Sequence, residues 1–508
     1  MSLARSLASS LTGAQPDDQR NDLDDDLDGD HPREKCGVFG IWGDGDASRK
    51  TALGLHALQH RGQEAAGIVS FDGERFHAQR GVGQVSTIFG KEEVMAKLTG
   101  KGAIGHVRYA TTGDGAQRNI QPLFAELAVG GFCLAHNGNL TNAQTLRNAL
   151  VQDGAIFQST TDTEVIVHLI ARTHGKSMVQ RLETALQQVE GAYSLVCMGD
   201  DAVIAVRDPL GVRPLVLGKQ GESYIVASET CALDILGADF IRDVEPGEML
   251  ILNEKGVTSR KAQTRPKPRF CLFEYIYFAR PDSQMEERSV YAARKEIGKE
   301  LSRESGVDAD VVIPVPDSGV PAALGYSEES GIPFELGIIR NHYVGRTFIE
   351  PAQRIRDFGV KLKHNANRAM IEGKRVILVD DSIVRGTTSI KIVQMVRAAG
   401  AREVHMRIAS PPTSHSCFYG IDTPARSELL ASRMNEPEMA AHINADSLAF
   451  ITIDGLYRAM GHAKRDPANP QFCDACLTGD YPTRLVDRDA RSDQDKPEDQ
   501  LSLLHEFA

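Results

Sequence analysis

The chain has 508 residues and a formal net charge of −12, with 41% hydrophobic and 25% charged residues. These values are typical of a soluble globular protein with two or three domains. No apolar run is long enough to span a membrane, and the acidic residues gather near the two ends, so nothing indicates a membrane protein or a nucleic-acid partner. Eight cysteines without a secretory signal predict a reducing, cytoplasmic environment.

Residues 1–35 are predicted to be a disordered acidic propeptide. Eight aspartates lie between Asp17 and Asp30, and the segment has little to bury. A transit peptide is the alternative for residues 1–15, although the acidic half fits it badly. Because the leader ends directly before Cys36, its removal would expose that cysteine as a new N-terminus.

Cys36 begins a glycine-rich β pattern, C-G-V-F-G-I-W-G. A thiol is a strong nucleophile near neutral pH, and an α-amino group titrates near ~8. An N-terminal cysteine could therefore supply both the nucleophile and the general base. Taken alone, Cys36 is better explained as a buried, inert cysteine at the start of a strand.

Three further motifs follow Cys36 in order. They are G-H-V-R-Y-A-T-T-G (105–113), L-A-H-N-G-N-L-T-N (134–142) and S-T-T-D-T-E-V (159–165). Together with the cysteine motif they resemble the glutaminase domain of the N-terminal-nucleophile amidotransferases. This resemblance implies an α+β domain with stacked β-sheets between helices.

The same resemblance implies a glutamine site. Arg108 would bind the α-carboxylate of glutamine and Asp162 its α-amino group. The side-chain amide of Asn137 and the backbone N–H of Gly138 would form the oxyanion hole, and Thr111 would line the pocket. Each residue also has an ordinary explanation, such as a surface arginine, a turn or a helix cap, but their shared order argues against coincidence.

A proline-rich basic stretch, 261–269, is predicted to link two domains. Residues 484–508 are predicted to be a disordered tail. The predicted division is a propeptide (1–35), a glutamine amidotransferase domain (36–265), a second domain (266–470) and a C-terminal segment with a disordered tail (471–508).

The second domain is predicted to have an α/β fold with a parallel sheet. Three apolar runs, Val311–Pro316, Val376–Val379 and Val404–Ala409, alternate with helical patterns. Asp380 and Asp381 follow the second run, and a small glycine-containing loop then leads into a helix. Backbone N–H groups and hydroxyls of such a loop can bind a phosphate, while the carboxylates can bind ribose hydroxyls or magnesium.

The string V-D-D-S-I-V-R-G-T-T (379–388) closely resembles the binding motif of type I phosphoribosyltransferases, which use phosphoribosyl pyrophosphate. The alternative, an ordinary turn with solvated aspartates, does not account for the whole string. The resemblance implies one Mg²⁺ per subunit, bound by Ser318, Asp380 and Asp381. It implies substrate contacts from a lid (Tyr343, Arg346, Thr347) and from the loop (Asp380, Asp381, Ser382, Arg385, Gly386, Thr387, Thr388).

Four cysteines suggest a metal site. Cys473 and Cys476 form a C-x-x-C pair, and Cys417 and Cys231 lie earlier in the chain. By chemistry alone they suit a structural zinc or an iron–sulfur cluster about equally. The spacing resembles the iron–sulfur subclass of the amidophosphoribosyltransferases, which implies one structural 4Fe–4S cluster per subunit. The remaining cysteines are predicted to pack in the core: Cys133, Cys197 and Cys271.

The resemblance to amidophosphoribosyltransferases runs from about residue 36 to about 483. It implies transfer of ammonia from glutamine to phosphoribosyl pyrophosphate, giving 5-phosphoribosylamine, pyrophosphate and glutamate in the first committed step of purine synthesis. It also implies a homotetramer inhibited by purine nucleotides. The departures are modest: the leader is long, and Arg340 and His342 stand where a Lys and an Arg are usual.

Two other functions remain as alternatives. An amidotransferase of the glucosamine-6-phosphate synthase type shares the first domain, but it has no use for the 379–388 motif. A regulatory sensor that keeps the phosphoribosyl fold would need a nucleic-acid-binding element, and the sequence contains no sign of one.

Overall fold

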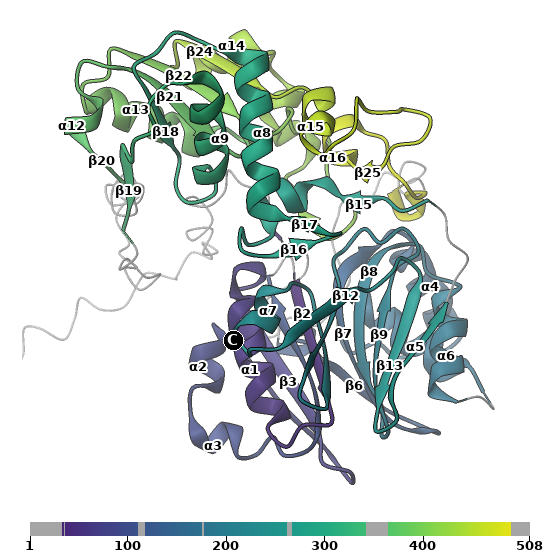
Figure 1. Cartoon of the computed structure of the whole chain (residues 1–508). Coiled ribbons are helices and arrows are strands. Elements are labelled where there is room, and N and C mark those ends of the chain that lie inside the picture. Colours follow the sequence, from purple (N-terminus) through teal and green to yellow (C-terminus); the bar gives the residue numbers. More distant parts are fainter. Residues whose placement is uncertain are drawn as a thin grey trace, which may run out of the picture.

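The computed structural model describes residues 33–34, 36–109, 117–174, 177–261, 267–341 and 364–488. Two domains lie one above the other in Figure 1, the first drawn from purple to teal and the second from teal to yellow. Within the described residues, no helix combines the length and the apolar character needed to cross a bilayer.

Two antiparallel sheets form the centre of the first domain. The order of the first sheet is β12 (Asp239–Asp243), β10 (Val216–Gln220), β11 (Ser223–Ala227), β2 (Cys36–Trp42), β5 (Gly102–Arg108), β3 (Ala65–Phe71) and β4 (Phe76–Val82). That of the second is β14 (Gly256–Lys261), β13 (Glu248–Asn253), β9 (Val203–Arg207), β8 (Gly191–Met198), β7 (Gly130–Leu140) and β6 (Leu123–Leu127).

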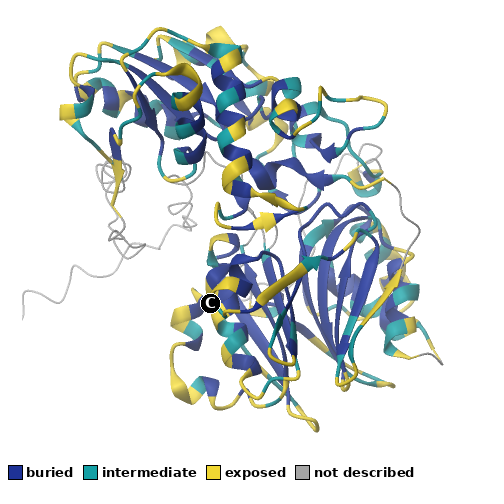
Figure 2. Cartoon of the chain, in the orientation of Figure 1, coloured by how far each residue is buried: buried dark blue, intermediate teal, exposed yellow. Residues whose placement is uncertain are grey.

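The two sheets pack face to face, and helices cover their outer faces. Val38 and Ile104 from the first sheet meet Val196 and Leu250 from the second in one buried cluster. Because both faces of β2 and β8 are covered, these strands are buried along most of their length and read as apolar runs (Figure 2). The covering helices are α1 (Ala47–Ala57), α2 (Val85–Phe89), α3 (Glu92–Met95) and α7 (Cys231–Asp234) on the first sheet, and α4 (Ala143–Gln152), α5 (Thr163–Arg172) and α6 (Met178–Leu186) on the second.

The second domain is built on a parallel sheet, as predicted. Its strand order is β18 (Val311–Pro314), β21 (Arg375–Asp380), β22 (Glu403–Ile408) and β24 (Ser447–Phe450). The helices around it are α8 (Val290–Ser305), α9 (Val320–Ser330), α12 (Arg368–Ile371), α13 (Thr387–Ala398), α14 (Glu436–His442) and α15 (Ile453–Ala459). The carboxyl ends of neighbouring parallel strands meet at one edge, where ligands of such sheets bind.

Short elements join the two domains. β15 (Phe270–Cys271) pairs with β25 (Phe472–Cys473), and β16 (Gln284–Met285) pairs with β17 (Arg288–Ser289); a π-helical turn, η3 (Glu274–Phe278), and α16 (Ala475–Thr478) complete this region. A further pair, β19 (Ile338–Arg340) with β20 (His364–Ala366), belongs to the second domain. One apolar cluster contains Ala192 and Val212 of the first domain together with Phe273 and Tyr419 of the second. The domains therefore share a continuous core.

Both chain ends depart from the predicted disorder where the structure describes them. In the leader, β1 (Arg33–Glu34) pairs with β23 (Ile421–Asp422); the other predicted leader residues lie outside the described residues. The prediction that the tail is disordered from residue 484 is wrong for 484–488. There the carboxylate of Asp487 accepts hydrogen bonds from the backbone N–H groups of Gln144 (2.8 Å) and Thr145 (2.9 Å) at the start of α4. Nothing in the sequence pattern indicates this contact, because the two segments are about 340 residues apart.

Candidate active site

Cys36 and Arg108 lie side by side at one end of the first sheet. Cys36 begins β2, Arg108 ends β5, and the two residues are directly opposite in the antiparallel register. The guanidinium of Arg108 is mostly buried, which lowers its pKa, while Cys36 and Glu64 oppose the shift. A guanidinium so poorly hydrated is suited to bind a carboxylate beside the thiol.

The predicted oxyanion-hole residues lie near the end of β7, which packs against β2. The Asn137 side chain is completely buried, and its amide nitrogen and oxygen have no hydrogen-bond partner among the described residues. Gly138 has φ +150°, and a Cβ there would lie 2.1 Å from the carbonyl oxygen of Ala192, so only glycine fits. A buried amide without a partner is costly, and a substrate oxygen would satisfy it.

Asp162 comes from the start of α5 and faces the same strand end. Its Oδ2 accepts a hydrogen bond from the backbone N–H of Leu140 (2.9 Å), and its Oδ1 lies 3.7 Å from Nδ1 of the buried His136. Burial disfavours the charge, but His136 and the backbone N–H groups hold the pKa of Asp162 below its usual value. The side chain makes no helix-capping hydrogen bond, so the capping explanation does not account for it. Thr111, predicted for this pocket, lies outside the described residues.

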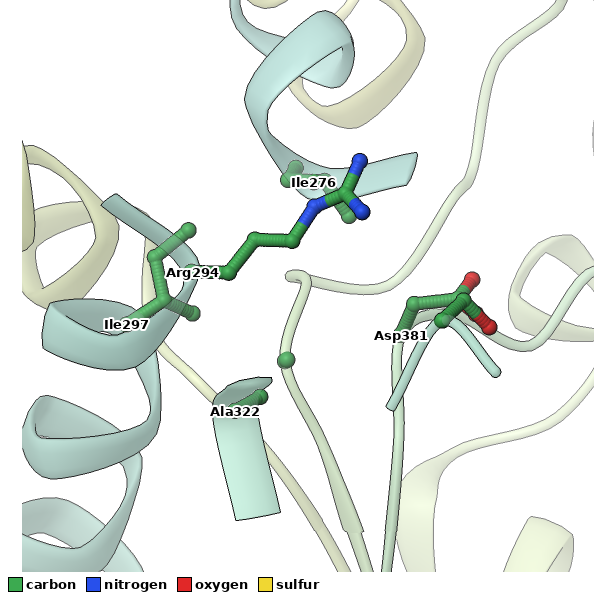
Figure 3. A pocket seen from close by; sticks show the side chains of 7 residues that line it. Ile276, Arg294, Ile297, Ala322 and Asp381 are labelled. Atoms are coloured by element: carbon green, nitrogen blue, oxygen red, sulfur yellow. The ribbon is translucent and has the colours of Figure 1, made fainter. Parts of the chain in front are cut away.

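The two adjacent carboxylates lie at the carboxyl end of β21, and both are buried. The backbone N–H of Asp381 donates to Oδ1 of Asp380 (2.9 Å), and the hydroxyl of Ser382 donates to Oδ1 of Asp381 (2.6 Å). Asp381 lines a small pocket with Ser318, which follows β18, and with Arg294 from α8 (Figure 3). Ser318 and Asp381 are thus brought together as predicted. Their role in binding magnesium stays a prediction.

Arg294 was not predicted as a site residue. Its guanidinium is buried and donates to the carbonyl oxygens of Tyr275, Tyr277 and Ala279 at 2.7–2.8 Å. Burial lowers its pKa, and the nearby Asp381 opposes the shift. In the sequence Arg294 is one of several charged residues on an amphipathic helix, so no local signal distinguishes it.

The loop after Ser382 leads into α13. Gly386 stands at the N-cap position with φ +83°, and a Cβ there would lie 2.9 Å from Leu430. Thr387 and Thr388 form the first turn, at the positive end of the helix dipole. Arg385 is partly exposed and pairs with Glu428 (2.9 Å). The predicted lid residues lie outside the described residues: Tyr343, Arg346 and Thr347.

The structure corrects the predicted set of cysteines. Cys271 and Cys473 are opposite each other in the β15–β25 pair, and Cys417 and Cys476 pack against the same apolar cluster. Burial raises the pKa of the Cys271 thiol to about 12. The nearby Arg213 opposes this rise, whereas Glu274 and Cys417 add to it. The prediction that Cys231 completes the set is wrong. Its thiol lies 3.8 Å from the carbonyl oxygen of Ala57 and 3.8 Å from a carboxylate oxygen of Glu229, and Cys231 belongs to the buried cluster of the first sheet rather than to that of the other three.

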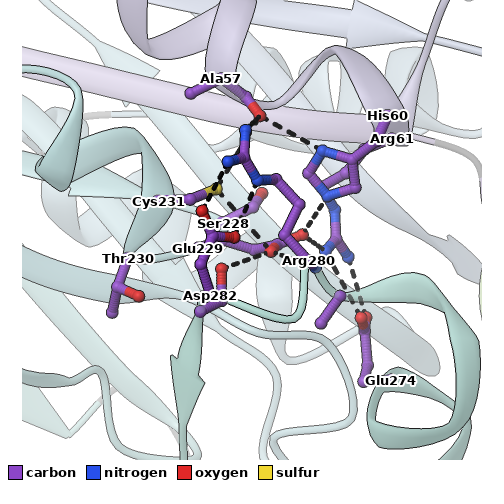
Figure 4. Close-up of polar contacts among 12 residues, drawn as sticks. Ala57, His60, Arg61, Ser228, Glu229, Thr230, Cys231, Glu274, Arg280 and Asp282 are labelled. Atoms are coloured by element: carbon purple, nitrogen blue, oxygen red, sulfur yellow. Dashed lines mark hydrogen bonds and ion pairs between the residues drawn. The ribbon is translucent and has the colours of Figure 1, made fainter. Parts of the chain in front are cut away.

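A buried ionic network joins the two domains (Figure 4). Arg61 pairs with Glu229 of the first domain and with Glu274 of η3 (2.8 Å), and its Nε donates to the carbonyl oxygen of Cys36 (3.3 Å). Burial disfavours the Arg61 charge, but the two carboxylates raise its pKa above the usual value. Glu229 also accepts hydrogen bonds from the Ser283 hydroxyl (2.7 Å) and from the backbone N–H of Arg280 (3.0 Å).

Both halves of the chain match known sequence families. A family described as a glutamine amidotransferase domain matches residues 106–234, and one described as a phosphoribosyl transferase domain matches residues 284–410.

The match to individual relatives extends over most of the chain. This chain is 61% identical to the amidophosphoribosyltransferase of Rhizobium etli over 482 residues, an alignment that covers 94% of this chain and 96% of that protein. The Bacillus subtilis amidophosphoribosyltransferase is 51% identical over 453 residues, or 89% of this chain and 95% of that protein. The solved B. subtilis glutamine phosphoribosylpyrophosphate amidotransferase, complexed with ADP and GMP, has a TM-score of 0.84 at 50% identity, covering 89% of this chain and 98% of that one. This chain therefore belongs to the amidophosphoribosyltransferase family of enzymes.

Proposed function

We propose that the enzyme transfers ammonia from glutamine to phosphoribosyl pyrophosphate, giving 5-phosphoribosylamine, pyrophosphate and glutamate at the start of purine synthesis. The observation that carries this proposal is the joining of two unlike sites in one chain. One holds a cysteine, an arginine and a buried, unpaired amide; the other holds paired carboxylates before a helix N-terminus. Neither a stand-alone glutaminase nor a stand-alone phosphoribosyltransferase needs both.

The first half-reaction takes place at Cys36, after removal of the residues before it. The Cys36 thiol attacks the amide carbon of glutamine, and its α-amino group accepts the thiol proton. Arg108 and Asp162 hold the α-carboxylate and the α-amino group of the substrate. The side-chain amide of Asn137 and the backbone N–H of Gly138 donate to the oxyanion, ammonia leaves, and water then releases glutamate.

The second half-reaction takes place at the carboxyl ends of β18 and β21. Ammonia attacks C1 of the ribose and displaces pyrophosphate with inversion. Asp380, Asp381 and Ser318 would supply oxygen ligands of the kind that Mg²⁺ prefers, and substrate phosphates and water would supply the others, because Mg²⁺ seldom uses a full set of protein ligands. When bound, the ion neutralises charge on the leaving pyrophosphate. The lid residues Tyr343, Arg346 and Thr347 are proposed to close over the substrate and exclude water.

The two half-reactions need an internal route for ammonia. In bulk water at neutral pH ammonia becomes ammonium, which is not a nucleophile. The continuous core and the buried ionic network between the domains are suited to keep water out of such a route.

A direct assay tests the proposed function. The purified enzyme with glutamine, phosphoribosyl pyrophosphate and Mg²⁺ is expected to release glutamate and pyrophosphate in equal amounts. Intact mass should show a chain that begins at Cys36. Release of neither product by a chain that begins at Cys36 would contradict the proposal and favour the regulatory sensor.

We also propose that the corrected cysteine set holds a structural 4Fe–4S cluster. Within the described part of the chain, no three Cys, His, Asp or Glu side chains are placed to hold a metal ion. A four-iron cluster binds one thiolate on each iron, so its ligands stand farther apart than those around one zinc ion. Four thiols around one buried apolar cluster suit the larger group. The proposed ligands are Cys271, Cys417, Cys473 and Cys476.

Two cysteine variants test this assignment. Cys271→Ser is expected to remove essentially all iron and sulfide from anaerobically purified enzyme, because the cluster loses one of its four ligands. Cys231→Ser is the matched control, a buried cysteine outside the set, and should keep about four irons per chain. Normal iron in Cys271→Ser, or its loss in Cys231→Ser, would contradict the corrected set.

The regulation of the enzyme and its oligomeric state are proposed from its resemblance to the family. Because the B. subtilis relative was solved with ADP and GMP bound, we expect purine nucleotides to inhibit this enzyme as feedback. A homotetramer is the assembly that the family resemblance implies.

A further inference from the structure

The backbone of the second domain touches the predicted oxyanion hole. Gly420, between Tyr419 and β23, lies directly against Gly138. A Cβ on Gly420 would stand 2.9 Å from the Cα of Gly138, 3.0 Å from its carbonyl carbon and 3.3 Å from its carbonyl oxygen. Contacts below 3.0 Å are not tolerated between a Cβ and backbone, so only a residue without a side chain allows this approach.

Two neighbouring contacts place the same segment at the glutamine site. Asn139 follows Gly138 on β7, and its side-chain amide donates to the carbonyl oxygen of Phe418 (3.0 Å). Residues Ile421–Asp422 pair with Arg33–Glu34, which lie just before Cys36. The segment 418–422 therefore contacts both the end of β7 and the residues just before Cys36.

The segment is held by hydrogen bonds among its own residues and by contacts with the C-terminal part of the chain. The backbone N–H of Cys417 donates to the hydroxyl of Thr423 (2.7 Å), and that of Tyr419 donates to the Cys417 sulfur (3.3 Å). The hydroxyl of Tyr481 donates to the carbonyl oxygen of Ser416 (2.7 Å). The Phe418 and Tyr481 rings meet edge to face with centroids 5.4 Å apart. Gly420 therefore belongs to a segment whose backbone is fixed by hydrogen bonds and side-chain packing.

We propose that Gly420 is a positioning residue for glutamine hydrolysis, which fixes the Gly138 peptide so that its N–H points at the oxyanion. The proposal rests on the proposed function, because it assumes that Gly138 donates to the tetrahedral intermediate. Gly138 sits in a conformation open only to glycine, with φ +150°. Gly138 is also paired opposite Tyr193 in the β7–β8 ladder. A Cβ on Gly420 would meet the Cα and the carbonyl group of Gly138, and a Cβ on Gly138 would meet the Ala192 carbonyl oxygen, so Gly138 is closely enclosed by both segments.

Gly420→Ala is the direct test. The added methyl group must push the Gly138 peptide away, and a misplaced oxyanion donor is expected to lower kcat for glutamine about 10- to 100-fold. KM for glutamine should change less than about threefold, because Arg108 and Asp162 still hold the ground state. Turnover with free ammonia should stay within about twofold of the wild type, since the phosphoribosyl site is untouched.

A transition-state probe separates positioning from a general structural effect. Glutamate γ-semialdehyde forms a tetrahedral adduct with a thiol and so needs the oxyanion hole, whereas glutamate as product inhibitor does not. In Gly420→Ala the affinity for the aldehyde should fall by about the same factor as kcat, and the affinity for glutamate should be unchanged.

Gly73→Ala is the matched control. Gly73 has φ +103° against +106° for Gly420, but a Cβ there would meet nothing within 4 Å. It therefore carries the same backbone strain without the contact, and its kinetics should be those of the wild type. If Gly420→Ala does not fold, Asn139→Ala removes the neighbouring hydrogen bond to Phe418 and should lower kcat in the same direction by a smaller factor.

Three results would overturn the proposal: a wild-type kcat in Gly420→Ala, an equal loss of glutamine- and ammonia-dependent turnover, or an equal effect of Gly73→Ala. Failure of the proposed function has a different signature, because wild-type enzyme that begins at Cys36 would then release no glutamate.

Discussion

Cys36→Ala is expected to abolish glutamine-dependent turnover while leaving most of the ammonia-dependent turnover. Removing the attacking sulfur removes the covalent route, and losses of this kind reach at least about a thousandfold in kcat, or about 4 kcal/mol in the activation barrier. The phosphoribosyl site lies in the other domain and keeps its ligands. Pyrophosphate release measured with glutamine and then with ammonium salts at alkaline pH separates the two activities.

The ammonia-dependent rate is the internal control for this variant. If it vanished together with the glutamine-dependent rate in a folded protein, the division of labour between the two sites would be wrong. Replacing Cys231, a buried cysteine outside the site, should leave both rates close to those of the wild type.

Asp381→Asn is expected to differ from Cys36→Ala, because it should lower both the glutamine-dependent and the ammonia-dependent turnover by at least about 100-fold. Asp381 is buried in the pocket with Ser318 and Arg294, so its charge acts at low dielectric, and an amide cannot replace the carboxylate in its proposed role as a ligand for the metal or the ribose. Pyrophosphate release should fall equally with glutamine and with ammonia as the nitrogen source. A magnesium titration should show a higher half-saturating concentration.

Asp308→Asn provides the matched control for Asp381→Asn. Asp308 is exposed and pairs with Arg375 at the opposite end of the same sheet, before β18 begins. Its replacement should leave turnover and magnesium dependence unchanged. Normal turnover in Asp381→Asn would show that the acidic pair is structural.

The parts of the site that the sequence revealed are those carried by continuous stretches of chain. The 379–388 motif contains the end of its strand, the acidic pair, the loop and the start of the helix within ten residues, so its local structure follows from the string itself. Cys36 and Arg108 are farther apart, but each stands at the end of a recognisable strand. The fold class follows in the same way from the apolar runs.

The parts that the sequence could not reveal depend on contacts between distant segments. Cys231 and Cys271 are both buried, and only the pairing of β15 with β25 shows which one joins Cys473. Arg294 acts from the buried face of a helix whose pattern is ordinary. Gly420 has a role only because Gly138 lies against it. Neither the hydrophobic periodicity nor the spacing of residues in the sequence indicates these contacts between distant segments.

The Asp487 cap on α4 has a consequence for how the protein is made. Residues 36–261 leave the ribosome long before residues 417–488, yet α4 receives its side-chain cap from Asp487 and β7 is held by Asn139 bonding to Phe418. A nascent first domain would therefore carry an α4 whose first turn lacks its side-chain cap. The start of α4 would be completed only when the last part of the chain has been made.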